Sequence, residues 1–192
     1  MTASATEHGI NTDMSRYPLG IVIAHAGDRY SLTFVRDYPH SFDRVWQAIT
    51  DPERTRTWWA ATRIDLREGV QFDIQRLNGE NGQPQHWTTG VILHLDPPNL
   101  LEQTNSDHGV LHWELAPLGD DSTRLTFTNE FSGEGKWVPM SLGGWHAHLD
   151  HLHEALDGKE IGWADWYPDF IHAWQSFHDE YQKVVPAQRS TT

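Results

Sequence analysis

Cysteine is absent from the sequence, and basic residues are few. A chain without cysteine has no disulfide framework, no thiolate zinc site and no cysteine nucleophile. Lys and Arg together number 14 against 27 Asp and Glu, so the formal net charge is -13. Such a surface repels phosphate backbones and anionic lipid, and we therefore expect neither nucleic acid nor a membrane surface as a partner.

Long apolar runs and the common catalytic motifs are also missing. No stretch approaches the ~18 apolar residues that a membrane helix needs, and Met1–Met14 lacks the basic and apolar pattern of a signal peptide. There is no GxSxG elbow, no glycine-rich phosphate loop and no HExxH sequence. These absences predict a soluble, cytoplasmic protein without a cofactor, for which catalysis is the minority interpretation.

The chain of 192 residues is long enough for one domain with a sizeable core. We expect a disordered tail at 1–16, a single domain at 17–185 with an extra helix at 165–185, and a second tail at 186–192. The ten tryptophans are unusual, because this bulky side chain needs a hydrogen-bond partner when it is buried. They indicate either thick aromatic packing or a cavity lined by aromatic rings, and composition alone does not choose between the two.

The middle of the chain consists of short segments of alternating polarity, separated by turn residues, which is typical of β-strands. The predicted strands are Gly20–Ala26, Arg29–Asp37, Thr62–Leu66, Val70–Leu77, His86–Leu95, Leu100–Thr104, Val110–Ala116 and Thr123–Phe131. Ser41–Thr50 has helical spacing and ends at Asp51-Pro52. Strands joined by short turns are antiparallel neighbours, so the predicted fold class is α+β.

The segment Leu142–Gly158 predicts an amphipathic helix that covers the sheet, with Gly158 as its C-cap. Its apolar residues fall on one face: Trp145, Leu149, Leu152 and Leu156. Its polar residues fall on the opposite side: Asp150, His151 and Glu154. A second helix, Asp165–Val185, has one aromatic stripe that packs against the domain or a partner subunit: Trp166, Phe170, Trp174, Phe177 and Tyr181.

Four stretches in order resemble a known family: Tyr38–Trp59, Gly90–Leu101, Thr123–Phe131 and Gly144–Gly158. They are similar to the activator of heat-shock-protein-90 ATPase homologue family, which belongs to the START-like, Bet-v-1-like (SRPBCC) superfamily. The resemblance runs from about Gly20 to Gly158. It implies a helix-grip fold, in which a curved antiparallel sheet wraps around the long helix and leaves a cavity between them.

The resemblance predicts the fold more specifically than the function, because one fold can support many activities. The superfamily mostly binds apolar small molecules, which favours a protein that binds a small apolar or aromatic ligand. The family name comes from eukaryotic co-chaperones of the stress response, so a chaperone-binding interaction module is an alternative. A cyclase- or lyase-type enzyme that uses a cavity histidine is another alternative. A homodimer is a further candidate assembly.

The candidate ligand cavity combines the aromatic residues of the strands with those of the long helix. Its predicted lining is Trp58, Trp59, Phe72, Trp87, Trp113, Phe127, Asn129, Trp145, His148, Leu149 and Leu152. In particular, we expect Trp59, Trp87, Trp113 and Trp145 to surround an internal void. A plain aromatic core is the alternative. In the strand Val110–Ala116, His112 and Glu114 alternate with inward residues and should face solvent.

His148 lies at the margin of the apolar face, where it could contact a ligand or act as a general base. The competing interpretation is a boundary histidine hydrogen-bonded to the backbone. An acid–base pair of His148 with Asn129 or Glu130 is conceivable.

A second histidine cluster, His146, Asp150 and His153, shares one side of the helix and has ligand types that suit zinc. We find no fourth ligand for it. The sequence therefore predicts that this is a solvated helix side without a metal.

Overall fold

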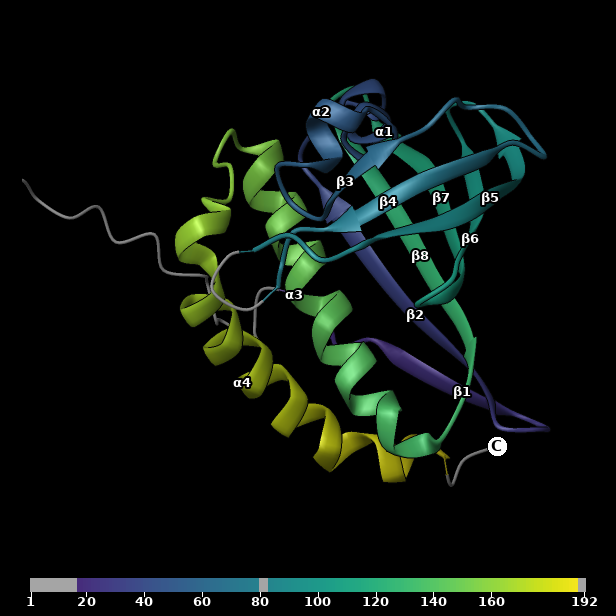
Figure 1. The fold of residues 1–192 in the computed structure, drawn as a ribbon, viewed down its shortest axis with the longest axis vertical. Helices are drawn as coiled ribbons and strands as arrows, with labels where there is room; N and C mark the ends of the chain where they lie inside the picture. The colour runs from purple at the N-terminus through teal and green to yellow at the C-terminus, as the bar shows by residue number, and fades with distance from the viewer. Residues whose placement is uncertain (1–16, 80–82, 190–192) are drawn as a thin grey trace, which may run out of the picture.

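The computed structural model describes residues 17–79 and 83–189, so the predicted disorder at 1–16 lies outside the described residues. The chain forms an eight-stranded curved sheet in the order β1-β2-β8-β7-β6-β5-β4-β3, and neighbouring strands are antiparallel (Figure 1). The strands are β1 (Ile21–His25), β2 (Arg29–Tyr38), β3 (Ala60–Arg63), β4 (Gln71–Arg76), β5 (Trp87–Asp96), β6 (Leu100–Asn105), β7 (Gly109–Gly119) and β8 (Ser122–Ser132).

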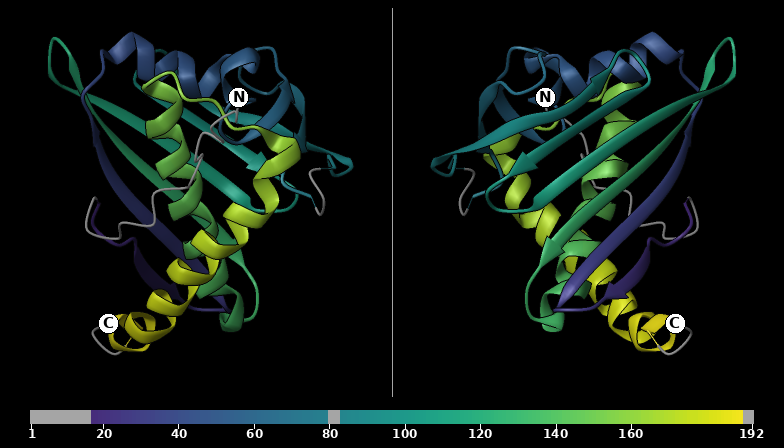
Figure 2. Two further views of the ribbon diagram at one scale, coloured as in Figure 1. Left: turned by 90° about the vertical axis from the view of Figure 1, so that its left-hand side faces the viewer. Right: turned by 90° about the vertical axis from the view of Figure 1, so that its right-hand side faces the viewer.

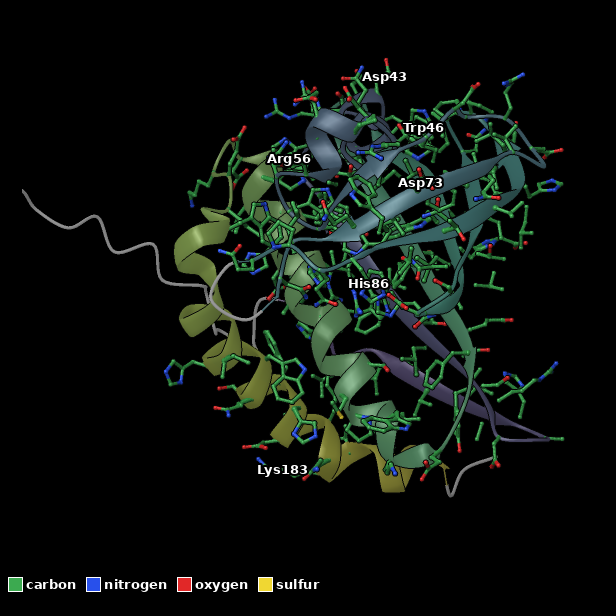
Figure 3. The ribbon with its side chains drawn as sticks, viewed as in Figure 1. Asp43, Trp46, Arg56, Asp73, His86 and Lys183 are labelled. Atoms are coloured by element: carbon green, nitrogen blue, oxygen red, sulfur yellow. The ribbon has the colours of Figure 1, made fainter. Side chains whose placement is uncertain are left out.

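Two small helices lie at one end of the sheet and two long helices lie along its inner side. The helices are α1 (Phe42–Thr50), α2 (Pro52–Thr55), α3 (Val138–Leu156) and α4 (Trp163–Arg189), with the 3-10 turn η2 (Gly135–Trp137) leading into α3. Asp43 and Trp46 of α1 mark one end of the molecule in Figure 3, and Lys183 of α4 marks the other. Figure 2 shows α4 crossing α3 on the side that faces away from the sheet.

The predicted strand pattern is confirmed, with one shift. The β1–β2 hairpin turns at Gly27 and Asp28, whose φ angles of 75° and 52° are the left-handed values that tight hairpins require. The strand predicted at Thr62–Leu66 begins earlier, as β3 (Ala60–Arg63), because Ala60 already pairs with Arg76 of β4. The following residues leave the ladder, and Ile64 and Leu66 pack against the core without strand pairing.

The apolar face of α3 lies on the sheet as predicted. Trp145, Leu149, Leu152 and Leu156 are all buried. The rings of Trp145 and Phe127 of β8 are 4.5 Å apart between centroids, which places the helix directly against the predicted strand. The helix ends at Leu156, and Gly158 follows with a φ of 85° and donates its N–H to Ala155 O.

The opposite side of α3 is not solvated, which corrects the prediction. His146, Asp150, His151 and His153 are all buried. At His146 the reason is that α4 covers this side of the helix: the His146 ring stacks on Phe177 at 4.2 Å, and His146 Nδ1 lies 2.8 Å from the Tyr181 hydroxyl. His153 is enclosed by the rings of Tyr17, Tyr38 and His40.

The aromatic stripe of α4 packs against the domain where it is described. Phe177 and Tyr181 are fully buried and Trp174 is half-buried, whereas the side chains of Trp166 and Phe170 lie outside the described residues. The helix is longer than predicted at both ends, where helix boundaries are least well defined by sequence, and it includes part of the predicted 186–192 tail. None of the helices in the described ranges is long and apolar enough to cross a membrane.

Candidate ligand pocket

A pocket of about 440 Å³ lies where the first half of α3 meets the end of β8, the β6–β7 turn, the end of β4 and α4. Its apolar wall consists of Phe131, Trp137, Met140, Trp145 and Trp174. Trp174 reaches this wall from α4, and its Nε1–H donates to Met140 O at 3.3 Å. The pocket is therefore built jointly by the sheet and by both long helices.

Two adjacent glycines of α3 shape this region in different ways. A Cβ at Gly143 would lie 3.1 Å from His178 N, so the missing side chain lets α4 approach closely. A Cβ at Gly144 would meet no heavy atom within 4 Å, because Gly144 faces the pocket. Any longer side chain at Gly144 would extend into the pocket space.

The floor of the pocket is held by Asn129. Its Oδ1 accepts the Trp145 Nε1–H at 3.0 Å, and its amide nitrogen donates to His108 O and to Val110 O. Asn129 lines the pocket, but its amide oxygen and its amide nitrogen already form hydrogen bonds with protein groups. It fixes the Trp145 indole in one orientation rather than presenting a free polar group to a ligand.

His148 also lines the pocket, and it donates Nδ1–H to Trp58 O at 3.3 Å. The backbone bond that the competing interpretation expected is therefore present together with the pocket position. Burial lowers the pKa of His148 to about 3, and the neighbouring His151 contributes in the same direction. The pairing of His148 with Glu130 that the sequence left open is not formed, because Glu130 points to the outer face of the sheet and accepts from Ser31 Oγ.

His108 is a pocket residue that the sequence analysis missed. It lies in the β6–β7 turn, and its ring centroid is 5.4 Å from that of Trp145. The ring centroid of His148 lies 6.0 Å from that of Trp145. Burial lowers the pKa of His108 to about 4, with a further decrease from the charge of Arg76. Two neutral imidazoles thus flank the indole of Trp145 in one pocket.

The polar rim of the pocket consists of Arg76 and Asp107, which also escaped the sequence analysis. Arg76 Nη2 and Asp107 Oδ2 are 3.2 Å apart. A signal for Arg76 was present, since it follows Phe72 and Ile74 in the inward register of β4. The turn that carries Asp107 and His108 has no such periodicity.

The predicted void among the tryptophans is not present where it was expected. Trp58, Trp59, Trp113 and Phe127 pack on one another and on Trp145, with ring centroids 4.1 to 6.1 Å apart. Their large rings fill the space between helix and sheet at this level. The open space lies on the other side of Trp145, toward Gly144.

The other predicted lining residues also lie outside the pocket. Trp87 is 37 % exposed and lies under the guanidinium of Arg63, 4.0 Å from the ring centroid. Phe72, Leu149 and Leu152 are buried in the core. His112 and Glu114 alternate with buried Leu111, Trp113 and Leu115, as predicted for outward residues.

Within the described ranges, no group of three or more His, Asp or Glu side chains is arranged to hold a metal ion. In the histidine cluster of α3, His146 Nε2 is 3.9 Å from Asp150 Oδ1, whereas His153 Nε2 is 3.5 Å from Asp157 Oδ2. The two histidines thus face different carboxylates. Their ring nitrogens at Nδ1 face Tyr181 and Tyr17.

A curved antiparallel sheet that grips a long helix beside a pocket defines the START-like, Bet-v-1-like class of proteins. The model of one family in this class, described as activator of Hsp90 ATPase homolog 1-like protein, matches residues 39–157. The chain belongs to this family. A search of curated proteins gave no match.

Solved structures share the fold at low sequence identity. The crystal structure of CalU16 from Micromonospora echinospora is 23% identical with a TM-score of 0.64, over 86% of this chain and 95% of that chain. EF2215 from Enterococcus faecalis, a conserved protein of unknown function, is 13% identical with a TM-score of 0.64, over 86% and 91%. DynU16, a protein of the dynemicin biosynthetic locus, is 21% identical with a TM-score of 0.56, over 68% and 48%.

Proposed function

We propose that the protein binds a small, largely apolar, aromatic molecule in the pocket beside Gly144. The observation that carries this proposal is the pocket itself: about 440 Å³, with Trp145 fixed at its floor and further aromatic side chains around it. This volume lies within the range of about 300–1,000 Å³ that is usual for small-molecule sites. A few polar groups at one end of an apolar wall are also typical of such sites.

The variant Gly144→Leu tests the proposal most directly. The leucine side chain should extend into the pocket, because no heavy atom lies within 4 Å of the added Cβ. Replacing a glycine inside a helix should also stabilise the unliganded protein, by up to about 1 kcal/mol. We therefore expect a higher melting temperature without ligand and no further rise when aromatic ligands are added.

Gly144→Ala is the matched control, because it makes the same backbone change and leaves most of the pocket open. Its melting temperature should still rise when a ligand that binds the native state is added. Native mass spectrometry of the freshly purified wild type would identify bound molecules. If Gly144→Leu binds ligands as the wild type does, the pocket is not the site. If no aromatic ligand binds the wild type, the interaction-module alternative leads.

A second candidate function is proton transfer to or from the bound molecule. His108 and His148 support it, because both line the pocket and flank Trp145. A neutral imidazole can accept a proton from a bound ligand and return it at another position, which is the chemistry of an isomerising or cyclising enzyme, but the lowered pKa values of His108 and His148 make both weaker bases than a free imidazole. Incorporation of solvent deuterium into a bound aromatic ketone, catalysed by the wild type, would support this candidate over simple binding.

A further inference from the structure

The rim of the pocket contains one partly satisfied cation. The Arg76 and Asp107 side chains are 30% and 26% exposed and form an ion pair of 3.2 Å between Nη2 and Oδ2. A guanidinium carries five N–H donors, and among the described residues Asp107 is the only ion-pair partner of Arg76. Arg76 itself lines the pocket, where a ligand could bind the guanidinium donors that this ion pair does not use.

Arg76 is also the only full positive charge in the described lining of the pocket. The remaining charged residue there is Asp107, and the two histidines are neutral at physiological pH. After burial, the charge of Arg76 is one of the causes that lower the pKa of His108 and of His148. The field of this guanidinium therefore reaches the part of the pocket that lies beside Trp145.

We propose that the ligand is an aromatic carboxylate, whose acidic group binds Arg76 while its rings lie against Trp145 and Trp174. This inference rests on the proposed function of the same pocket. The planar guanidinium of an arginine matches a carboxylate in geometry and charge, and a neutral ligand would not form this charge-assisted pair. Asp107 occupies part of the guanidinium and competes with the incoming anion.

The net charge of -13 opposes any anion, but mostly from a distance. At an ionic strength of 0.1 M, interactions between exposed charges are screened beyond about 10 Å. A carboxylate in contact with Arg76 is inside this length. The local contact therefore decides the preference of the pocket.

The test compares 2-naphthoate with its neutral isostere 2-naphthamide by titration calorimetry at 0.1 M salt. The wild type should bind the naphthoate more tightly than the amide. Arg76→Gln should weaken naphthoate binding by about tenfold, the usual size of a lost charge-assisted contact, and leave the amide within about twofold. Asp107→Asn should strengthen naphthoate binding, because it removes the competing carboxylate.

Arg63→Gln is the charge-matched control. Arg63 lies over Trp87 outside the pocket, so this variant makes the same change in net charge without touching the rim. It should bind naphthoate as the wild type does. If Arg63→Gln and Arg76→Gln weaken naphthoate binding equally, a general electrostatic effect replaces the proposed contact, and the inference is overturned.

The remaining outcomes separate this inference from the proposed function. If the amide binds as tightly as naphthoate and Gly144→Leu blocks both, the pocket is a ligand site but the preference for a carboxylate is wrong. If neither compound binds the wild type, the proposed function fails for two-ring aromatic ligands, and the inference fails with it. If Arg76→Gln does not fold, Asp107→Asn alone decides, and unchanged naphthoate affinity in that variant overturns the inference.

Discussion

Acid should begin to destabilise this protein above the pH range in which most carboxylates titrate, because of three histidines inside α3. His146, His148 and His151 are 1%, 8% and 5% exposed. Burial is the largest cause that lowers their pKa values from 6.5, to about 3, about 3 and about 4. The charge of Arg36 lowers the pKa of His146 further, whereas Glu154 partly opposes the decrease at His151.

The direction of the effect follows from these values. Above pH 6.5 the three histidines are neutral in the folded and in the unfolded chain, and their contribution to stability is complete. Below pH 6.5 these histidines bind protons in the unfolded chain but stay neutral in the native state, so the free energy of unfolding decreases as the pH falls. The loss continues until the pH reaches the folded-state pKa values.

The size of the effect is large compared with the stability of a domain. Each site loses about 1.4 kcal/mol per pH unit below its unfolded pKa, which is about 2 kcal/mol at pH 5. The three sites together then lose about 6 kcal/mol, against a total of about 5–15 kcal/mol for a typical native protein. We therefore expect a midpoint of acid unfolding between about pH 4 and pH 5.

Urea unfolding at several pH values between 7.5 and 5, followed by tryptophan fluorescence, measures this slope. His151→Gln should reduce the slope by about one proton, because one protonation site of the unfolded chain is removed. His172→Gln is the control, since His172 lies exposed on α4 and does not belong to the buried group. A free energy of unfolding that stays constant from pH 7 to 4.5 would show that the native state accepts these protons, and would refute the reasoning.

Two substitutions test how α3 is held between the sheet and α4. Tyr181→Phe should cost about 2–4 kcal/mol in urea unfolding, because the hydroxyl accepts Gly20 N–H at 2.7 Å and lies 2.8 Å from His146 Nδ1, and both buried partners would lose it. Leu152→Asp should abolish folding, since it places an unpaired charge in the core, whereas Leu118→Asp at an exposed position should melt cooperatively. A cooperatively melting Leu152→Asp variant would contradict the role of α3 as the cover of the sheet.

The architecture could be predicted from sequence because it depends on periodicity. Alternation within each strand and the spacing of Trp145, Leu149, Leu152 and Leu156 define two apolar surfaces that can only be buried against each other. The turn at Gly27 and Asp28 likewise depends on local conformational preference. These signals are contained within single elements and do not require knowledge of what lies beside them.

The environment of the polar side of α3 could not be predicted in this way. A helical wheel places His146 and Asp150 on the side of α3 that borders its polar face. It does not reveal that Phe177 and Tyr181 of α4 cover that side, and that an imidazole can stack on a phenyl ring as an apolar surface does. A polar pattern in one helix thus predicts solvent only when no second amphipathic helix can reach it.

The pocket was misplaced for a related reason. Large aromatic residues in a sequence indicate where rings fill the core, not where space is left open. In this chain the rings of Trp58, Trp59 and Trp113 pack against one another and leave no cavity between them. Open space arises where a side chain is missing, and Gly144 has no signature that distinguishes it from its neighbour Gly143 in the sequence. The difference between them appears only when α4 is in place, because α4 lies against Gly143 and leaves Gly144 uncovered.

The helix α4 therefore decides what the pocket can accept, although it lies outside the residues 39–157 that the family model matches. It covers the histidine side of α3, and through Trp174 it supplies one wall of the pocket. A family member with the same core and a different segment after the long helix would have a pocket of different shape. The ligand of one relative consequently does not transfer to another through the shared core, and the selectivity proposed for this chain rests on Trp174 together with Arg76 and Gly144.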